Sequence, residues 1–227
     1  MPYDFDKIAR TYDRLNRLMT FGLDRRWRKR AVKAVEGGKR KEESVLDVAC
    51  GTGDMCVELL ERGCIVTGVD LSEEMLTIAK RKVENAKWKV ADAEHLPFED
   101  ATFDAVTCAF GVRNFMHLEQ GLGEMLRVLK PGGRMVILEL ATPDSKLIRF
   151  FYNLYTRHVI PWLGSRIASN REAYTYLPDS IARFPKGNDF LRIIQNSKFK
   201  IQNCTERKLT FGVCRLYTIE KKIIFRG

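Results

Sequence analysis

The sequence of 227 residues lacks the long apolar stretch of a membrane-spanning helix. No window approaches the roughly 18 consecutive apolar residues that such a helix needs. The first ten residues, MPYDFDKIAR, also lack the apolar core of a signal peptide. We therefore expect a protein of the cytosol. The length suits one domain whose core needs neither disulfides nor a metal.

Cysteine pairs of the kind that bind zinc are missing. None of the six cysteines forms a CxxC pair, and none has a histidine at zinc-ligand spacing. Most lie in apolar runs, where cysteine behaves as a small hydrophobe. The pattern favours buried free thiols in a reducing compartment, and it predicts no metal site.

Acidic residues are scarce near the amino terminus. Residues 1–41 hold 13 Lys and Arg against 5 Asp and Glu, so +8 of the net charge of +10 lies there. A basic segment can meet nucleic acid, anionic lipid or an acidic substrate, or it can simply be a solvated helix face.

Apolar patterns typical of helices and strands alternate along the chain. Helices are predicted over residues 5–19 and 24–35, the second with Asp24 as its N-cap. Strands are predicted over 44–49, 65–70, 87–91, 104–110 and 134–140, and helices over 54–62, 72–84 and 119–129. The sequence LKPGGR, residues 129–134, predicts a sharp turn. Repeated strand–helix–strand units favour a parallel α/β sheet that is covered on both faces.

Composition divides this single domain into four segments. Residues 1–41 form a basic, helical amino-terminal arm, and residues 42–144 form the alternating core. Residues 145–195 are rich in aromatics and helical in pattern. Residues 196–227 hold two strand-like runs, at about 199–206 and 211–222.

The stretch VLDVACGTGD, residues 45–54, joins an apolar strand to a turn with two glycines. It lacks the GxxxxGK[ST] pattern of a P-loop, and Cys56 stands where a dinucleotide-binding GxGxxG turn has its third glycine. Both absences disfavour a phosphate site. S-adenosylmethionine has no phosphates, but it needs close approach of the backbone to its methionine part, which Gly51 and Gly53 permit.

Carboxylates at the ends of the next two strands favour the same ligand. Asp70 ends the second strand, where it could accept hydrogen bonds from both ribose hydroxyls. Asp92 follows the third strand and could accept from an adenine amino group, while the backbone N–H of Ala93 could donate to the ring. Each feature alone is weak, because an Asp after a strand often caps a helix. Together, at consecutive strand ends, they favour an adenosyl site.

Seven stretches carry a resemblance to known enzymes. VLDVACGTGD, GVDLS, DAEHLPFEDATFDAV and LRVLKPGGRMVILE resemble class I S-adenosylmethionine-dependent methyltransferases. FDKIARTYDRLNRLMTFGLDRRWRKRAV, FGVRN at 110–114 and residues 158–185 are similar to the C-methyltransferases of ubiquinone and menaquinone biosynthesis. The chain departs from that family at Cys50, where a Gly is usual, and at Ala109, where some relatives have a Ser that touches the cofactor. Thr142 and Pro143 follow LELA where relatives read closer to EFSxP.

The resemblance implies a Rossmann-like fold with a mostly parallel, seven-stranded twisted sheet and S-adenosylmethionine as cofactor. The residues expected to contact that cofactor are Asp47, Gly51, Thr52, Gly53, Asp70, Leu71, Asp92, Ala93 and Ala109. The implied reaction is methylation of a ring carbon of a reduced, prenylated quinone. The acceptor would be demethylmenaquinol or the related ubiquinone precursor.

Ring methylation needs a group that stabilises phenolate charge and a route for protons. Arg113 and Asn114 follow the fourth strand and suit the first role. His117 is the nearest histidine in sequence and the candidate base, although a lone histidine is more often structural or exposed. Tyr12 and Tyr176 could hydrogen-bond the quinol, or they could serve only in packing.

Residues 147–163, LIRFFYNLYTRHVIPWL, are dense in aromatic and aliphatic side chains. They could hold a prenyl tail, with the helix at 5–19 as a cover, or form an ordinary amphipathic helix. We expect the apolar face of the helix at 5–19 to pack on the protein. The charge of the arm would then dominate a transient, peripheral contact with an anionic membrane surface at its inner face.

Other functions remain open at this point. The chain could methylate another small molecule or RNA, or it could be a non-catalytic adenosine-binding partner in a quinone-biosynthesis complex. An NPPY-like motif and a separate RNA-binding domain are absent from the sequence, so we expect no nucleic-acid partner. The missing third glycine disfavours a nicotinamide oxidoreductase. The oligomeric state is undetermined, with a homodimer as one alternative.

Overall fold

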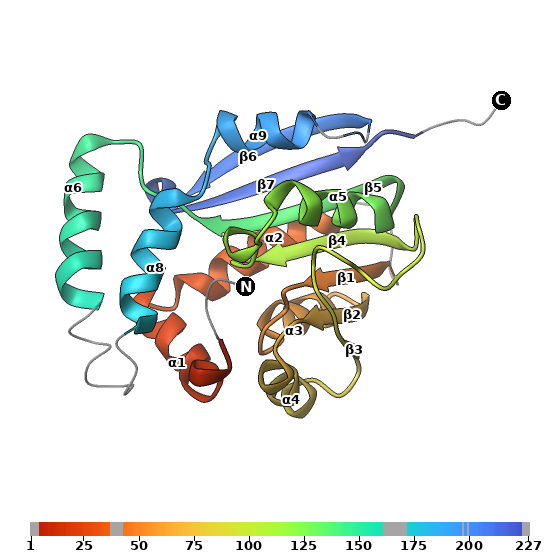
Figure 1. Cartoon of the computed structure of the whole chain (residues 1–227), viewed down its shortest axis with the longest axis horizontal. Helices are drawn as coiled ribbons and strands as arrows, with labels where there is room; N and C mark the ends of the chain where they lie inside the picture. Colours follow the sequence, from red (N-terminus) through yellow and green to blue (C-terminus); the bar gives the residue numbers. More distant parts are fainter. Residues whose placement is uncertain (1–4, 37–42, 161–171, 197, 199, 224–227) are drawn as a thin grey trace.

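The computed structural model describes residues 5–36, 43–160, 172–196, 198 and 200–223 (Figure 1). Its centre is a seven-stranded sheet in the order β3-β2-β1-β4-β5-β7-β6. Strand β7 is antiparallel to both of its neighbours, and the other pairs are parallel. The strands are β1 Ser44–Val48, β2 Ile65–Asp70, β3 Lys87–Val90, β4 Phe103–Ala109, β5 Leu129–Leu140, β6 Ile201–Leu209 and β7 Cys214–Lys221. The predicted seven-stranded, mostly parallel sheet is thereby confirmed.

Helices connect most of the parallel strands, except β3 and β4, and extend the chain at both ends of the core. The amino-terminal helices are η1 Phe5–Ile8, α1 Ala9–Met19 and α2 Leu23–Glu36. Those of the core are α3 Asp54–Leu60, α4 Glu73–Lys82, η2 Val112–Asn114 and α5 Leu118–Val128. Those after the core are α6 Lys146–Leu154 with its π-helical extension η3 Tyr155–Val159, α8 Glu172–Arg183, α9 Asn188–Gln195 and η4 Thr210–Gly212.

The two faces of the sheet bury two separate apolar clusters. Successive side chains of a strand point to opposite faces, and in β5 Met135 and Ile137 join one cluster while Val136 and Leu138 join the other. Helices α5 and α9 cover the first face, and α2, α3 and α4 cover the second. Burial on both faces explains why the central strands β1 and β4 and the second half of β5 read as apolar runs in the sequence, whereas the edge strands β3 and β6 are largely exposed.

Three local predictions were wrong. Helix α2 begins at Leu23, so Asp24 lies in its first turn and is not the N-cap. The segment LKPGGR belongs to β5, where pairing with β4 shifts register as at a bulge. A Cβ on Gly133 would lie 2.6 Å from the carbonyl oxygen of Asp104, so the strands approach closely there. The last strand begins at Cys214, because Thr210–Gly212 forms a tight 3-10 turn.

Helices α1, α6 and α8 lie together at one end of the sheet (Figure 1). Figure 1 shows the arrows of β4 and β5 pointing toward the end where α1, α6 and α8 lie. Open α/β sheets bind ligands at the carboxyl ends of their parallel strands. None of the helices in the described ranges is long and apolar enough to cross a membrane.

Candidate active site

The turn after β1 is tied to the end of β2 by Asp70. Its Oδ2 accepts a hydrogen bond from the backbone N–H of Gly51 at 2.8 Å, and its Oδ1 accepts from the N–H of Ser72 at 2.9 Å. Burial raises the pKa of Asp70, while these backbone bonds act to lower it. Gly51 has a φ of +54°, and the nearest atom to a Cβ built there is Cε1 of Tyr12 at 4.0 Å. The turn therefore presents open space beneath Tyr12.

A small cavity of about 70 Å³ lies over this turn. It opens toward solvent, since Leu71 and Met116 on its rim are 41% and 61% exposed. Six of the expected cofactor residues line it: Gly51, Asp70, Leu71, Asp92, Ala93 and Ala109. The structure thus gathers backbone and carboxylate groups from four strand ends into one groove.

The other three expected cofactor residues lie outside this lining. Asp47 is fully buried, accepts hydrogen bonds from the Thr107 hydroxyl and the Cys56 thiol, and has its pKa raised by burial to about 6. Gly53, with a φ of +82°, faces Trp88, which would lie 3.0 Å from a Cβ there. Asp47 and Gly53 therefore contact other protein groups that hold the glycine turn in place, and they do not face the cavity. The hydroxyl of Thr52 instead forms a hydrogen bond to Asp13.

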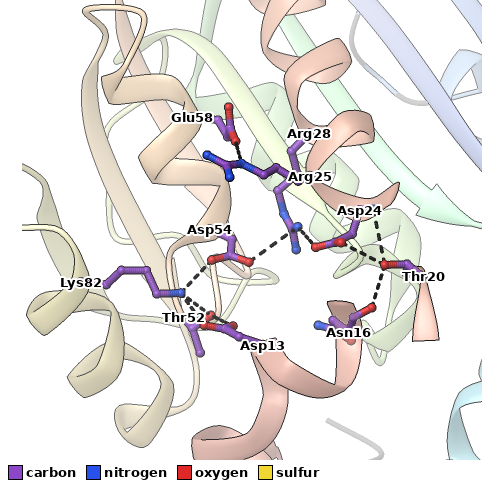
Figure 2. A network of polar contacts seen from close by, with 10 residues as sticks. All are labelled: Asp13, Asn16, Thr20, Asp24, Arg25, Arg28, Thr52, Asp54, Glu58 and Lys82. Atoms are coloured by element: carbon purple, nitrogen blue, oxygen red, sulfur yellow. Dashed lines mark hydrogen bonds and ion pairs between the residues drawn. The ribbon is translucent and has the colours of Figure 1, made fainter. Parts of the chain in front are cut away.

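Figure 2 shows Thr52 in a chain of polar contacts between the amino-terminal helices and the core. Its hydroxyl donates to Asp13 on α1. Lys82 on α4 lies 2.6 Å from Asp13 Oδ2 and 2.7 Å from Asp54 Oδ1. Burial acts to raise the pKa of Asp54, but Arg28 on α2 and Lys82 outweigh it, so the pKa is lowered. The network fastens α1 beside the glycine turn.

A second cavity of about 320 Å³ lies among α1, α2, α6 and α8. This volume is within the range of roughly 300–1,000 Å³ that small-molecule sites occupy. Apolar side chains dominate its wall, including Met19, Leu23, Trp27, Leu140, Ile148, Phe151, Leu177 and Ile181. Tyr12 and Phe110 line both cavities, so the two spaces adjoin at these rings.

Arg113 lies in the wall of the larger cavity. Its side chain is 5% exposed, and Nη1 donates to Glu139 Oε1 at 2.7 Å and to the carbonyl oxygen of Phe110. Burial acts to lower the pKa of Arg113, but Glu139 outweighs it, so the pKa is raised and the cation persists. Nε of Arg113 is a buried donor without a hydrogen-bond partner in the described structure. Buried donors are seldom left unpaired, and an unpaired one beside a cavity suits a ligand oxygen.

Asn114 lies beside Arg113 and lines the smaller cavity. Its Oδ1 accepts from the Tyr176 hydroxyl at 2.8 Å, which connects η2 to α8. His117 lines neither cavity. Its ring is 72% exposed, and Nδ1 lies 2.7 Å from Glu94 Oε2. The structure therefore brings Tyr12, Arg113 and Asn114 together and places His117 apart from them.

Sequence reasoning did not single out Asp13, Lys82, Glu139 or Tyr152. Tyr152 lines the larger cavity, and burial raises its pKa to about 12, an effect that the nearby Arg113 only partly offsets. Of these four residues, only Glu139 could have been identified from the sequence, because a carboxylate inside the apolar run MVILEL needs a buried partner. The Asp13–Lys82 pair spans 69 positions, and nothing in the local pattern indicates it.

Comparisons with known proteins show which proteins the chain resembles in sequence. A family model described as the ubiE/COQ5 methyltransferase family matches residues 3–221. The ubiquinone/menaquinone biosynthesis C-methyltransferase UbiE of Geobacter sulfurreducens is 44% identical, over 96% of this chain and 86% of its own. The demethylmenaquinone methyltransferase of Thermus thermophilus is 44% identical, over 94% of this chain and 97% of its own.

Solved structures show the same fold. A SAM-dependent methyltransferase from Thermotoga maritima has a TM-score of 0.63 at 19% identity, covering 96% of this chain and all of its own. One from Aquifex aeolicus has a TM-score of 0.59 at 18% identity, covering 84% of this chain and 89% of its own. At these identities the likeness concerns the fold alone.

Proposed function

The chain belongs to the ubiE/COQ5 methyltransferase family, and from this premise we propose that it methylates a ring carbon of a reduced, prenylated quinone with S-adenosylmethionine as donor. The acceptor class is demethylmenaquinol or the related ubiquinone precursor. The observation that carries the proposal is the buried Nε of Arg113, which has no partner among the described residues and lies in an apolar cavity that adjoins a carboxylate-lined groove.

The groove over the glycine turn suits the adenosyl and methionine parts of the cofactor. When bound, S-adenosylmethionine supplies an electrophilic methyl group on a sulfonium. The carboxylate of Asp70 accepts hydrogen bonds from the backbone N–H groups of Gly51 and Ser72, and it has lone pairs left for a ribose hydroxyl. Asp92, whose Oδ1 accepts from the N–H of Glu94, lies along the same groove near Ala93. Gly51 leaves the turn open to the methionine part.

Arg113 would act on the quinol ring at the junction of the cavities. Its persistent positive charge stabilises phenolate, which makes the adjacent ring carbon a better nucleophile. Tyr152, with its pKa near 12, stays protonated at neutral pH and can donate a hydrogen bond to a ring oxygen. Tyr12, shared by both cavities, can position the ring against the methyl group.

The prenyl tail would occupy the rest of the larger cavity. The side chains of Trp27, Ile148, Phe151 and Ile181 provide an apolar wall, so tail burial contributes binding energy without hydrogen bonds. Excluding water from this space also strengthens the interaction between Arg113 and a phenolate.

The test is a methyl-transfer assay with isotopically labelled S-adenosylmethionine and purified demethylated benzoquinols and naphthoquinols. We expect label on a ring carbon of a reduced, prenylated acceptor, identified by mass, and no label on the oxidised quinone, whose carbonyls cannot form phenolate. Comparison of the two acceptors assigns the class. Labelling of RNA or of another small molecule, with neither quinol labelled, would overturn the proposal.

A further inference from the structure

Most exposed apolar side chains surround the mouth of the larger cavity. Seven of the twelve large apolar side chains that are exposed in the described ranges lie on α6 and η3 or in the turns at Phe21 and Phe211, which are elements that line this cavity or adjoin its lining. They are Leu147, Phe150, Phe151, Leu154 and Val159 on α6 and η3, together with Phe21 and Phe211. Figure 1 shows α6 as the outermost element at the left end, with α8 between it and the sheet.

Phe21 and Phe211 protrude from turns of unusual conformation. They are 75% and 79% exposed, and their φ angles are +52° and +57°. A bulky side chain rarely adopts this left-handed region, and such residues cluster at functional positions. The Phe21 ring lies 5.6 Å from that of Tyr155 in the cavity wall. The residue before Phe211, Thr210, lines the cavity and accepts a hydrogen bond from Trp27 Nε1 at 2.8 Å.

Helix α6 with its extension η3 is apolar on two faces. Ile148, Tyr152 and Tyr155, spaced as one helical face, line the cavity. Leu147, Phe150 and Leu154 are 68%, 63% and 50% exposed and lie outside the cavity lining. A helix with a second apolar face needs a second apolar neighbour, and water does not provide one.

Basic residues outnumber acidic ones around this apolar rim, where Asp179 on α8 is also exposed. Residues 145–160 contain three Lys and Arg and no Asp or Glu. Arg26 and Arg30 are exposed on α2, shortly after Phe21. Asp144, which precedes α6, has Oδ2 at 2.7 Å from Lys208 Nζ and Oδ1 at 2.7 Å from Arg215 Nη2. Cations around an apolar surface match an anionic lipid headgroup layer over acyl chains.

We propose that Phe21, Phe211 and the outer face of α6 insert into the surface of an anionic lipid bilayer, so that the larger cavity opens directly onto the membrane. The purpose of this docking, uptake of a prenylated quinol from the bilayer, rests on the proposed function; the docking itself does not. Docking by apolar insertion differs from electrostatic attraction of the basic arm alone, because membrane binding through inserted apolar rings persists at high salt concentration.

The test is co-sedimentation of the full chain with vesicles, without substrate. Phosphatidylcholine vesicles and vesicles containing phosphatidylglycerol are compared at low and high salt. The rim variant is Phe150→Ser with Phe211→Ser, since neither residue lines the larger or the smaller of the two cavities described above. The matched control is Ile65→Ser with Ile223→Ser, 53% and 49% exposed, at the start of β2 and just beyond the end of β7.

We expect wild type and the control to bind both vesicle types and to bind the anionic vesicles more tightly. Part of this binding should persist at high salt. The rim variant should bind at least ~10-fold more weakly to both. It should keep its turnover on a short-tailed, water-soluble quinol and show a raised KM for a long-tailed quinol in vesicles. Binding abolished by salt, or equal in rim variant and wild type, would overturn the proposal. So would loss of a wild-type dimer in the rim variant without vesicle binding, which would identify the face as an interface between copies.

Discussion

Nη1 of Arg113 lies 2.7 Å from Oε1 of Glu139, and the two side chains are 5% and 1% exposed. Oε1 of Glu139 also accepts from the N–H of Leu140, so the pair connects η2 to the end of β5. A buried ion pair stabilises weakly as a pair, but loss of one partner leaves the other charge desolvated. Arg113 therefore has a structural role as well as its proposed chemical one, and mutation must separate the two.

We expect Arg113→Ala to lose roughly 3–5 kcal/mol of free energy of unfolding, because Glu139 is left unpaired. Its folded fraction should transfer methyl groups about 10²–10³-fold more slowly. Arg113→Met combined with Glu139→Gln should recover most of the stability but not the rate. Urea unfolding and single-turnover measurements check both parts. A double variant within about threefold of the wild-type rate would show that Arg113 acts through stability alone.

We expect Asp70→Asn to weaken S-adenosylmethionine binding by roughly 10-fold to 100-fold, the equivalent of one charged hydrogen bond. The amide group would also face the N–H of Gly51 or of Ser72, donor against donor, so the turn would loosen. Titration calorimetry measures the affinity. Glu73→Gln, an exposed change three residues further on, is the control and should keep the wild-type dissociation constant. Equal affinity in folded Asp70→Asn would remove Asp70 from the site.

The fold was largely predictable, because the period of apolar residues reports which faces are buried. The predicted strand at 65–70 coincides with β2, and parallel topology places Asp70 and Asp92 at one edge. At residues 129–134 the Pro and Gly residues led to the wrong prediction of a turn, since these residue types are typical of turns. The bulge that absorbs them in β5 depends on the neighbouring strand.

The site was less predictable, because its support comes from contacts between distant segments. Trp27 and Thr210 are 183 positions apart, yet their hydrogen bond fixes a turn at the cavity wall. Periodicity predicts that a face is buried, but it does not identify the partner. His117 shows that residues close in sequence need not share a site. It is three positions from Asn114, yet its ring is exposed and does not line the smaller cavity.

We expect Lys82→Met to speed dissociation of S-adenosylmethionine by about threefold to tenfold, because α1 with Tyr12 would be held less firmly over the turn. Lys82 and Asp13 are 26% and 27% exposed, so stability should fall by less than about 1 kcal/mol. Stopped-flow displacement measures the rate. Lys80→Met, exposed on the same helix, is the control. In a double-mutant cycle Asp13→Asn should add little to Lys82→Met, and full additivity would rule out the fastening role.

The buried carboxyl of Asp47 should make the free energy of unfolding depend on pH. Burial raises its pKa from 3.8 to about 6, so between these values the folded state holds a proton that the unfolded state has lost. Stability from this group is therefore fully present below pH 3.8 and is lost as pH rises through 6. At ~1.36 kcal/mol per pKa unit, the loss is roughly 3 kcal/mol.

Asp47→Asn should remove this slope, because its amide can accept from Thr107 and donate toward the Cys56 sulfur without a charge to desolvate. Denaturant unfolding of both proteins from pH 4 to pH 7.5 gives the difference in free energy of unfolding, in which other titrating groups cancel. Relative to wild type, Asp47→Asn should gain stability as pH rises across that range. Parallel profiles would mean that Asp47 keeps an ordinary pKa in the folded protein, and that the hydrogen bonds from Thr107 and Cys56 compensate its burial completely.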